Sequence, residues 1–179
     1  MKALTMANKR ILVLGVGNIL LRDEGVGVKA VVKLQSEYDF SNNVELMDGG
    51  TLGLTLLEPI CQADHLIVVD AVKYGHPPGT LYRFTAEDFE RRVRYKNSLH
   101  QLDLVETLAY AELLEKRPSA VVVGIEPEDM SPWGMELTEI VEARLSDVCS
   151  KVLEEIAAAG GTFTLRNGAQ REHPSERIA

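Results

Sequence analysis

The strongest constraint on the fold is the alternation of short apolar runs with longer segments of helical spacing. The runs, rich in Val, Ile and Leu, have the length of strands, and the segments between them repeat apolar residues every three or four positions. Successive βα units of this kind build a parallel sheet whose strands are covered on both faces. We therefore predict an α/β fold, a mainly parallel twisted sheet of about five strands with helices on both faces. The predicted strands cover residues 10–15, 44–48, 65–70, 80–84 and 120–125, and the predicted helices residues 23–37, 52–62, 101–116 and 138–159.

One of these strands differs from the others. Residues 80–84 alternate polar and apolar side chains and follow a Pro-Pro-Gly turn at 77–79. Too few residues separate this strand from the one at 65–70 for a helical crossover, which a parallel neighbour needs. We expect residues 80–84 to run antiparallel.

The length of the chain indicates one domain. Its 179 residues, 45% of them apolar, suffice for one core and leave little room for a second. We place this domain at residues 1–161. Residues 162–179 contain only Phe163, Leu165 and Ile178 as larger apolar side chains, so we expect a flexible C-terminal tail.

Charge and cysteine content exclude several classes of function. Nineteen Lys and Arg against 27 Asp and Glu give a net charge of −8, which disfavours binding to nucleic acid or anionic lipid. Cys61 and Cys149 lie far apart, without the spacing of a zinc finger or a disulfide framework. The apolar segment 11–21 follows basic residues but is too short to span a membrane and lacks a cleavage pattern. We expect a cytoplasmic protein, monomeric and without membrane insertion.

Carboxylates gather where the predicted parallel strands end. The first strand leads to Asp23 and Glu24, the second ends at Asp48 and the third ends at Asp70. In an open parallel sheet the binding site lies at the carboxyl ends of the strands, near the point where the strand order reverses. These acidic residues are therefore predicted to converge on one rim.

A dinucleotide site is the first alternative, because Gly15 and Gly17 follow the first strand in a Gly-x-Gly pattern. Against it, Leu20 replaces the third glycine, and Asp23 and Glu24 would repel a phosphate from the helix start while attracting a cation. The two acids could also serve to cap the helix, and one of them could do only that.

Asp70 on its own could cap a turn. His100, however, precedes the predicted helix 101–116, which would dock on the same sheet. A histidine beside two strand-end carboxylates completes an oxygen, oxygen, nitrogen set with open positions, which suits nickel, zinc or iron better than calcium. The alternative is that His100 binds no metal and is a structural or solvated side chain at a helix start.

Ordered motifs across residues 10–158 resemble the [NiFe] hydrogenase maturation endopeptidase family. They are ILVLGVGNILLRDEGVGV at 11–28, MDGGT at 47–51, VVDA at 68–71, PGT at 78–80, SLHQ at 98–101 and GIEP at 124–127. The resemblance implies an endopeptidase that removes the C-terminal extension of a hydrogenase large-subunit precursor after nickel insertion. It further implies that Glu24, Asp70 and His100 bind the nickel and that the loop at 48–51 lies near the cleft.

The chain departs from the family pattern at two positions. Many relatives have Asp where Glu24 stands, which keeps the charge and the donor type. Leu99 stands where Pro is frequent, which could alter the loop but leaves the ligand at His100 intact. We expect the nickel to be supplied by the precursor, and zinc or cadmium to occupy the same ligands at high concentration.

The expected mechanism uses no covalent nucleophile, because no serine or cysteine lies in a motif with a partner histidine. Nickel would position the scissile bond and either polarise its carbonyl or activate water. Asp48 would transfer the protons. A metal-binding chaperone and a dinucleotide-binding module, both without proteolysis, remain the alternatives.

Two further segments stay open at this point. Residues 85–97 form a basic stretch that is either a solvated loop or short helix, or a wall of the cleft. Trp133 lies outside the predicted helices and strands and is either a core plug or a contact for the substrate.

Overall fold

The computed structural model describes residues 9–51, 53–93 and 99–166. In chain order its elements are β1 (Ile11–Val16), the 3₁₀ turn η1 (Arg22–Gly25), α1 (Val26–Glu37), β2 (Tyr38–Phe40), β3 (Val44–Gly50), η2 (Leu54–Leu56), α2 (Leu57–Gln62), β4 (His65–Ala71), β5 (Leu81–Thr85), α3 (Ala86–Val93), α4 (Leu99–Leu113), β6 (Ser119–Ile125), α5 (Glu139–Ala159) and β7 (Phe163–Leu165).

The main sheet has five strands in the order β3-β1-β4-β6-β5. The pairs β3–β1, β1–β4 and β4–β6 are parallel, and β5 pairs with β6 antiparallel. The predicted α/β fold, its five strands and the antiparallel direction of residues 80–84 are therefore confirmed.

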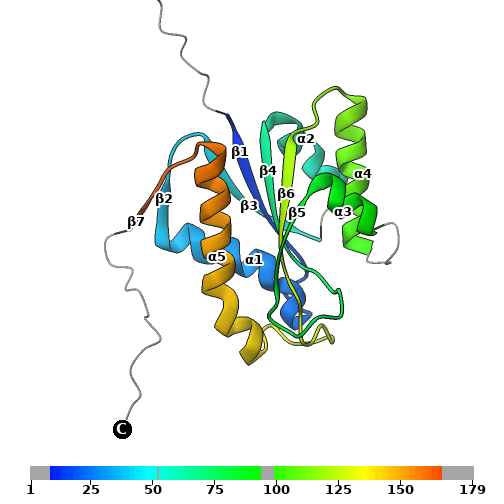
Figure 1. Cartoon of the computed structure of the whole chain (residues 1–179), viewed down its shortest axis with the longest axis vertical. Helices are drawn as coiled ribbons and strands as arrows, with labels where there is room; N and C mark the ends of the chain where they lie inside the picture. Colours follow the sequence, from blue (N-terminus) through cyan, green and yellow to red (C-terminus); the bar gives the residue numbers. More distant parts are fainter. Residues whose placement is uncertain (1–8, 52, 94–98, 167–179) are drawn as a thin grey trace, which may run out of the picture.

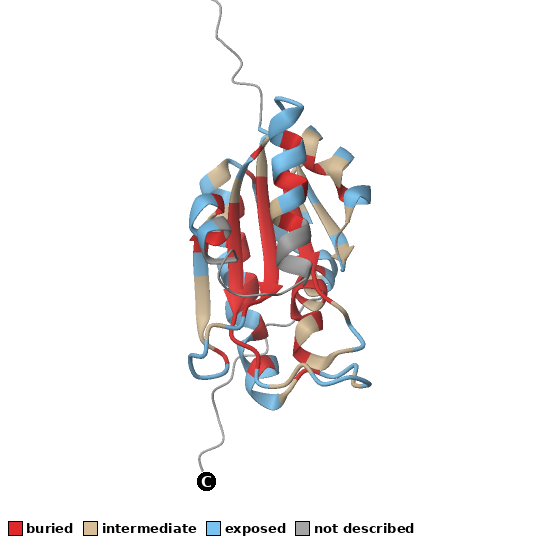
Figure 2. Ribbon diagram, turned by 90° about the vertical axis from the view of Figure 1, so that its right-hand side faces the viewer, coloured by how far each residue is buried: buried red, intermediate tan, exposed pale blue. Residues whose placement is uncertain are grey.

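Helices cover both faces of this sheet, as Figure 1 shows: α1 and α5 lie on one face, and α2, α3 and α4 on the other. The central strands are apolar throughout because successive side chains point to opposite faces of the sheet, and each face is covered by helices. Ile67 and Val69 of β4 pack with α1 and α5, whereas Leu66 and Val68 pack on the side of α2 and α4. In Figure 2 the central strands are accordingly buried over nearly their whole length.

The first helix can approach the sheet only because of its glycines. A Cβ placed on Gly27 would lie 2.0 Å from the carbonyl oxygen of Val69, and one on Gly15 would lie 2.3 Å from the carbonyl oxygen of Gly27. The start of α1 therefore crosses the carboxyl ends of β1 and β4 in direct backbone contact. This packing is what the Gly-x-Gly pattern of the sequence provides here.

The C-terminal segment requires a correction. Residues 162–166 belong to the predicted flexible tail, but Phe163–Leu165 form β7, which pairs antiparallel with β2. The ring of Phe163 meets that of Tyr38 edge to face, with the ring centres 5.7 Å apart. A strand this short is stabilised by aromatic contacts with a distant segment, which composition does not reveal. Residues 167–179 of the predicted tail lie outside the described residues.

The basic stretch at 85–97 is helical over Ala86–Val93, and Phe89 in α3 is buried in the core. This agrees with the short-helix interpretation for residues 86–93, while residues 94–97 fall outside the part that the structure describes. Within the described part, no helix is long and apolar enough to cross a membrane.

Candidate active site

The reversal of strand order lies between β1 and β4. From β1 the chain moves to β3 on one side, and then crosses to β4 on the other side of β1. The carboxyl ends of β1 and β4 meet at this reversal, which is the usual place of a site in such folds. Glu24 and Asp70 come from these two strand ends or the loops that follow them.

Asp70 is the most enclosed of the predicted ligands. It is 7% exposed, lies near the carboxyl end of β4, and is in register with Gly124 of β6. Alternation along β4 places it on the same face as Leu66 and Val68, the face covered by α2 and α4. A carboxylate is kept in so apolar a strand only at a cost in desolvation, which favours a role in a site.

Glu24 lies in η1, the turn that follows the loop after β1. This turn contacts β4, and the close approach of Gly27 to Val69 holds the chain just after Glu24 against the residue before Asp70. Glu24 is half-buried. The structure thus brings the segments of Glu24 and Asp70 to the same point of the rim, as predicted.

His100 lies in the first turn of α4. Because α4 leads into β6 through a short connection, its first turn is directed toward the carboxyl ends of the strands (Figure 1). That places His100 on the sheet face and at the sheet end that Asp70 occupies. Its side chain lies outside the described ones, and among the side chains described no three His, Cys, Asp or Glu gather as a metal site.

Asp48 is separated from the others by β1. It is in register with Gly15, which on its other side is in register with Val69, so two strand spacings of about 5 Å each separate Asp48 from β4. Asp48 is exposed, and its Oδ1 accepts a hydrogen bond of 2.8 Å from the amide of Gly50. Asp48 and Asp70 therefore lie on opposite sides of β1 in the sheet.

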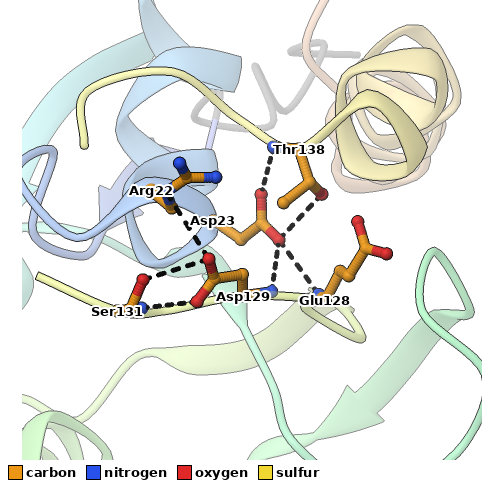
Figure 3. Close-up of polar contacts among 6 residues, drawn as sticks. All are labelled: Arg22, Asp23, Glu128, Asp129, Ser131 and Thr138. Atoms are coloured by element: carbon orange, nitrogen blue, oxygen red, sulfur yellow. Dashed lines mark hydrogen bonds and ion pairs between the residues drawn. The ribbon is translucent and has the colours of Figure 1, made fainter.

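Asp23, next to Glu24, has a different function. It is fully buried, and its carboxylate accepts hydrogen bonds from the amides of Glu128, Asp129 and Thr138 and from the Thr138 hydroxyl, at 2.8–3.0 Å (Figure 3). These donors are 105 to 115 positions away in sequence. Asp23 therefore does not cap its own helix; it anchors the segment between β6 and α5.

A second buried carboxylate is Glu126, in the GIEP motif, to which the sequence alone gives no role. It is 3% exposed and accepts hydrogen bonds from the amides of Tyr74 and Gly75 and from the hydroxyl of Tyr82. It fixes the loop after β4 in the way that Asp23 fixes the loop after β6. The signal in the sequence is an acid that directly ends an otherwise apolar strand.

Replacement of Glu126 by Gln should lower stability at neutral pH, by about 2 kcal/mol, and less in acid. Burial raises the pKa of Glu126, but the hydrogen bonds from Tyr82, Tyr74, Gly75 and His76 outweigh it and set the pKa below the ordinary 4.5. Its contribution is therefore complete above pH 4.5 and is lost as the pH falls through the lowered value. Thermal melts of the wild type and of Glu126→Gln from pH 7 to pH 3 measure the difference between their melting temperatures, which should narrow as the pH falls.

The control for this series is Glu128→Gln, which removes an exposed carboxylate two residues away. Its melting temperature should follow that of the wild type at every pH. A difference between wild type and Glu126→Gln that stays constant down to pH 3 would contradict the assignment.

The two cysteines offer no nucleophile. Both are free; Cys149 is buried and Cys61 half-buried. Burial raises the pKa of the Cys149 thiol to about 12, so the thiolate is absent at neutral pH. This agrees with the absence of a covalent mechanism in the sequence-based interpretation.

The fold and the rim define an α/β protein with buried carboxylates at its topological switch point. A family model described as hydrogenase maturation protease matches residues 28–155. The chain belongs to the hydrogenase maturation protease family, and its activity is that of a hydrogenase maturation endopeptidase, a hydrolase.

Individual relatives agree with this assignment. The chain is 38% identical over 170 residues to the hydrogenase expression/formation protein HupD of Thiocapsa roseopersicina, covering 94% of this chain and 77% of the relative. It is 39% identical over 153 residues to the hydrogenase 2 maturation protease of Escherichia coli, covering 84% and 93%. The solved structure of the hydrogenase maturating endopeptidase HybD from E. coli superposes with a TM-score of 0.83 at 38% identity, covering 88% of this chain and 98% of that one.

Proposed function

We propose that the protein removes the C-terminal extension of a [NiFe] hydrogenase large-subunit precursor, and that it recognises the precursor by nickel already bound there. Glu24, Asp70 and His100 are the proposed nickel ligands. The observation that supports this most is Asp70, a buried carboxylate at the switch point, against which η1 holds the segment of Glu24.

The donor set explains why the nickel would come with the substrate. Two carboxylates and one imidazole, without a thiolate, leave coordination positions open and bind nickel weakly alone. A nickel ion that keeps some of its ligands in the precursor can fill those positions. Binding of the ion to the rim then places the adjoining peptide over β1.

Hydrolysis adds water across the scissile peptide bond. The hydroxyl group goes to the carbonyl carbon and the proton to the departing amine. In this proposal nickel polarises the carbonyl or activates the water, and Asp48 accepts the water proton and returns it to the amine. The exposed position of Asp48 beside β1 gives it access to a peptide there, about 10 Å from the β4 side of the rim. We assign the reaction to the cytoplasm, consistent with the two unpaired cysteines.

The test compares nickel-loaded and nickel-free precursor as substrates of a protease stripped with a chelator. We expect cleavage of the loaded form only, seen as loss of the extension by mass spectrometry. Added zinc or cadmium should not restore cleavage of nickel-free precursor, because these ions would lie on the rim without the precursor attached. Equal cleavage of both forms would refute recognition through substrate-borne nickel.

A further inference from the structure

Two segments that meet after the carboxyl end of β1 carry four exposed apolar side chains. Ile19, Leu20, Trp133 and Met135 are 40%, 44%, 87% and 56% exposed. Two segments far apart in sequence supply them, and backbone hydrogen bonds join these segments: the amides of Trp133 and Gly134 both donate to the carbonyl of Leu20 at 3.1 Å. We call these four residues the rim patch. With this exposure Trp133 is not a core plug.

Hydrogen bonds and an ion pair hold the backbone of the rim patch in place. The amide of Arg22 donates to the carbonyl of Gly134, and the Arg22 side chain lies 3.5 Å from a carboxylate oxygen of Asp129. Asp23 binds the same loop from inside the protein (Figure 3). Trp133 itself has φ +71, a conformation that bulky residues avoid. A fixed loop that strains its backbone to present an indole to solvent is typical of a preorganised contact.

The rim patch adjoins the candidate site directly. Leu20 and Glu24 belong to one compact turn, in which the amide of Glu24 donates to the carbonyl of Leu21. A molecule whose nickel lies at Glu24 therefore passes over or beside the rim patch. No comparable continuity exists for the exposed Leu113, which lies at the far end of α4, toward the amino ends of the strands.

Charge indicates the chemistry of the occupant. Residues 127–143 contain five carboxylates and no Lys or Arg, namely Glu128, Asp129, Glu136, Glu139 and Glu142. Arg22 offsets only Asp129. An apolar patch with an acidic surround favours a peptide that carries apolar side chains next to a basic one, and disfavours an anionic lipid surface.

We propose that the rim patch binds an apolar segment of the hydrogenase large-subunit precursor flanked by Lys or Arg, with Trp133 as the main anchor. This inference rests on the proposed function, because the precursor is the molecule brought to Glu24. Burial of an exposed indole at the centre of an interface supplies a large share of binding free energy. The rim patch contributes to affinity, and the nickel ligands contribute to recognition and to cleavage.

The chain contains a single tryptophan, which permits a direct readout. Protease labelled with 5-fluorotryptophan gives one ¹⁹F resonance, from position 133. Addition of unlabelled, nickel-loaded precursor should shift or broaden this resonance. It should stay unmoved on dilution of the protease alone, since a concentration-dependent shift without precursor would identify a second copy as the occupant and overturn the proposal.

The matching kinetic test uses Trp133→Asn, because Asn tolerates a positive φ and removes the indole. The precursor concentration for half-maximal cleavage should rise about 10-fold while the rate at saturation stays within about twofold. Met135→Ser should act in the same direction with a smaller effect, and Leu113→Ser, at the far end of the sheet, should have none.

The two proposals fail in different ways. If the wild type leaves nickel-loaded precursor intact, the proposed function is wrong. If the wild type cleaves and Trp133→Asn needs no more precursor than the wild type, only the docking inference is wrong. A ¹⁹F resonance that is insensitive to saturating precursor also overturns it.

Discussion

Replacing Glu24, Asp70 or His100 by Ala should reduce precursor processing by at least about 100-fold, with little change in melting temperature. Removal of one of three nickel ligands from a weak site leaves too little affinity to hold the substrate's ion in register. The proposed role of these three residues is to bind the ion rather than to fill the core, so the expected loss of stability is small. Mass spectrometry of the precursor over time, with a thermal melt of each variant, checks both parts of this expectation.

Two comparisons make the result specific. Glu112→Gln, an exposed acid next to Leu113 at the far end of α4, should process precursor at the wild-type rate. Glu24→Asp should keep substantial activity, because it retains charge and donor type. Wild-type processing by an alanine variant at 24, 70 or 100 would remove that residue from the proposed site.

Asp23→Ala should have the opposite pattern, a loss of about 3 kcal/mol of stability, or roughly 10 °C in melting temperature. The change leaves three partly buried backbone amides, those of Glu128, Asp129 and Thr138, without their acceptor. An unsatisfied buried donor costs its full desolvation free energy. The loss of stability in Asp23→Asn should be smaller than in Asp23→Ala. The Asn side chain keeps one acceptor oxygen, but its NH₂ group faces backbone donors.

The adjacent positions 23 and 24 thus separate stability from activity. Denaturant unfolding of Asp23→Ala and Glu24→Ala under identical conditions measures the first property, and precursor cleavage at a temperature where both are folded measures the second. Equal stability of the two variants would show that the Asp23 hydrogen bonds contribute nothing net to folding.

The sheet and its layers could be predicted because the signals are local. Strands β1, β4 and β6 are apolar runs with a Gly or an acid at or next to their carboxyl ends, and burial on both faces favours this composition. The same pattern predicts that the acids at 23 and 24 and Asp70 lie at one end of the sheet, since parallel strands bring their carboxyl ends together; the choice of Glu24 as a ligand comes from the family resemblance. β7 escaped detection because three residues carry too little pattern.

The remainder depends on contacts between distant positions. The partners of Asp23 lie more than 100 positions away, so two neighbouring acids at a helix start look alike in the sequence. Asp48 is separated from the other acids because β3 is an edge strand. The sequence of a single strand does not reveal its position in the sheet.

The glycines after β1 have a consequence for what the rim attracts. Where such a pattern binds a nucleotide, glycine lets a phosphate approach the amides at the helix start. Here the space a Cβ would take on Gly27 is bordered by the carbonyl oxygens of Val69 and Val16, and that on Gly17 by the carbonyl oxygen of Glu24. Carbonyl oxygens of the protein's own backbone therefore occupy the space next to these glycines, close in sequence to Asp23 and Glu24. An architecture shared with anion-binding proteins is thus packed by its own carbonyl oxygens where a phosphate would otherwise approach, which supports the proposed preference for a cation.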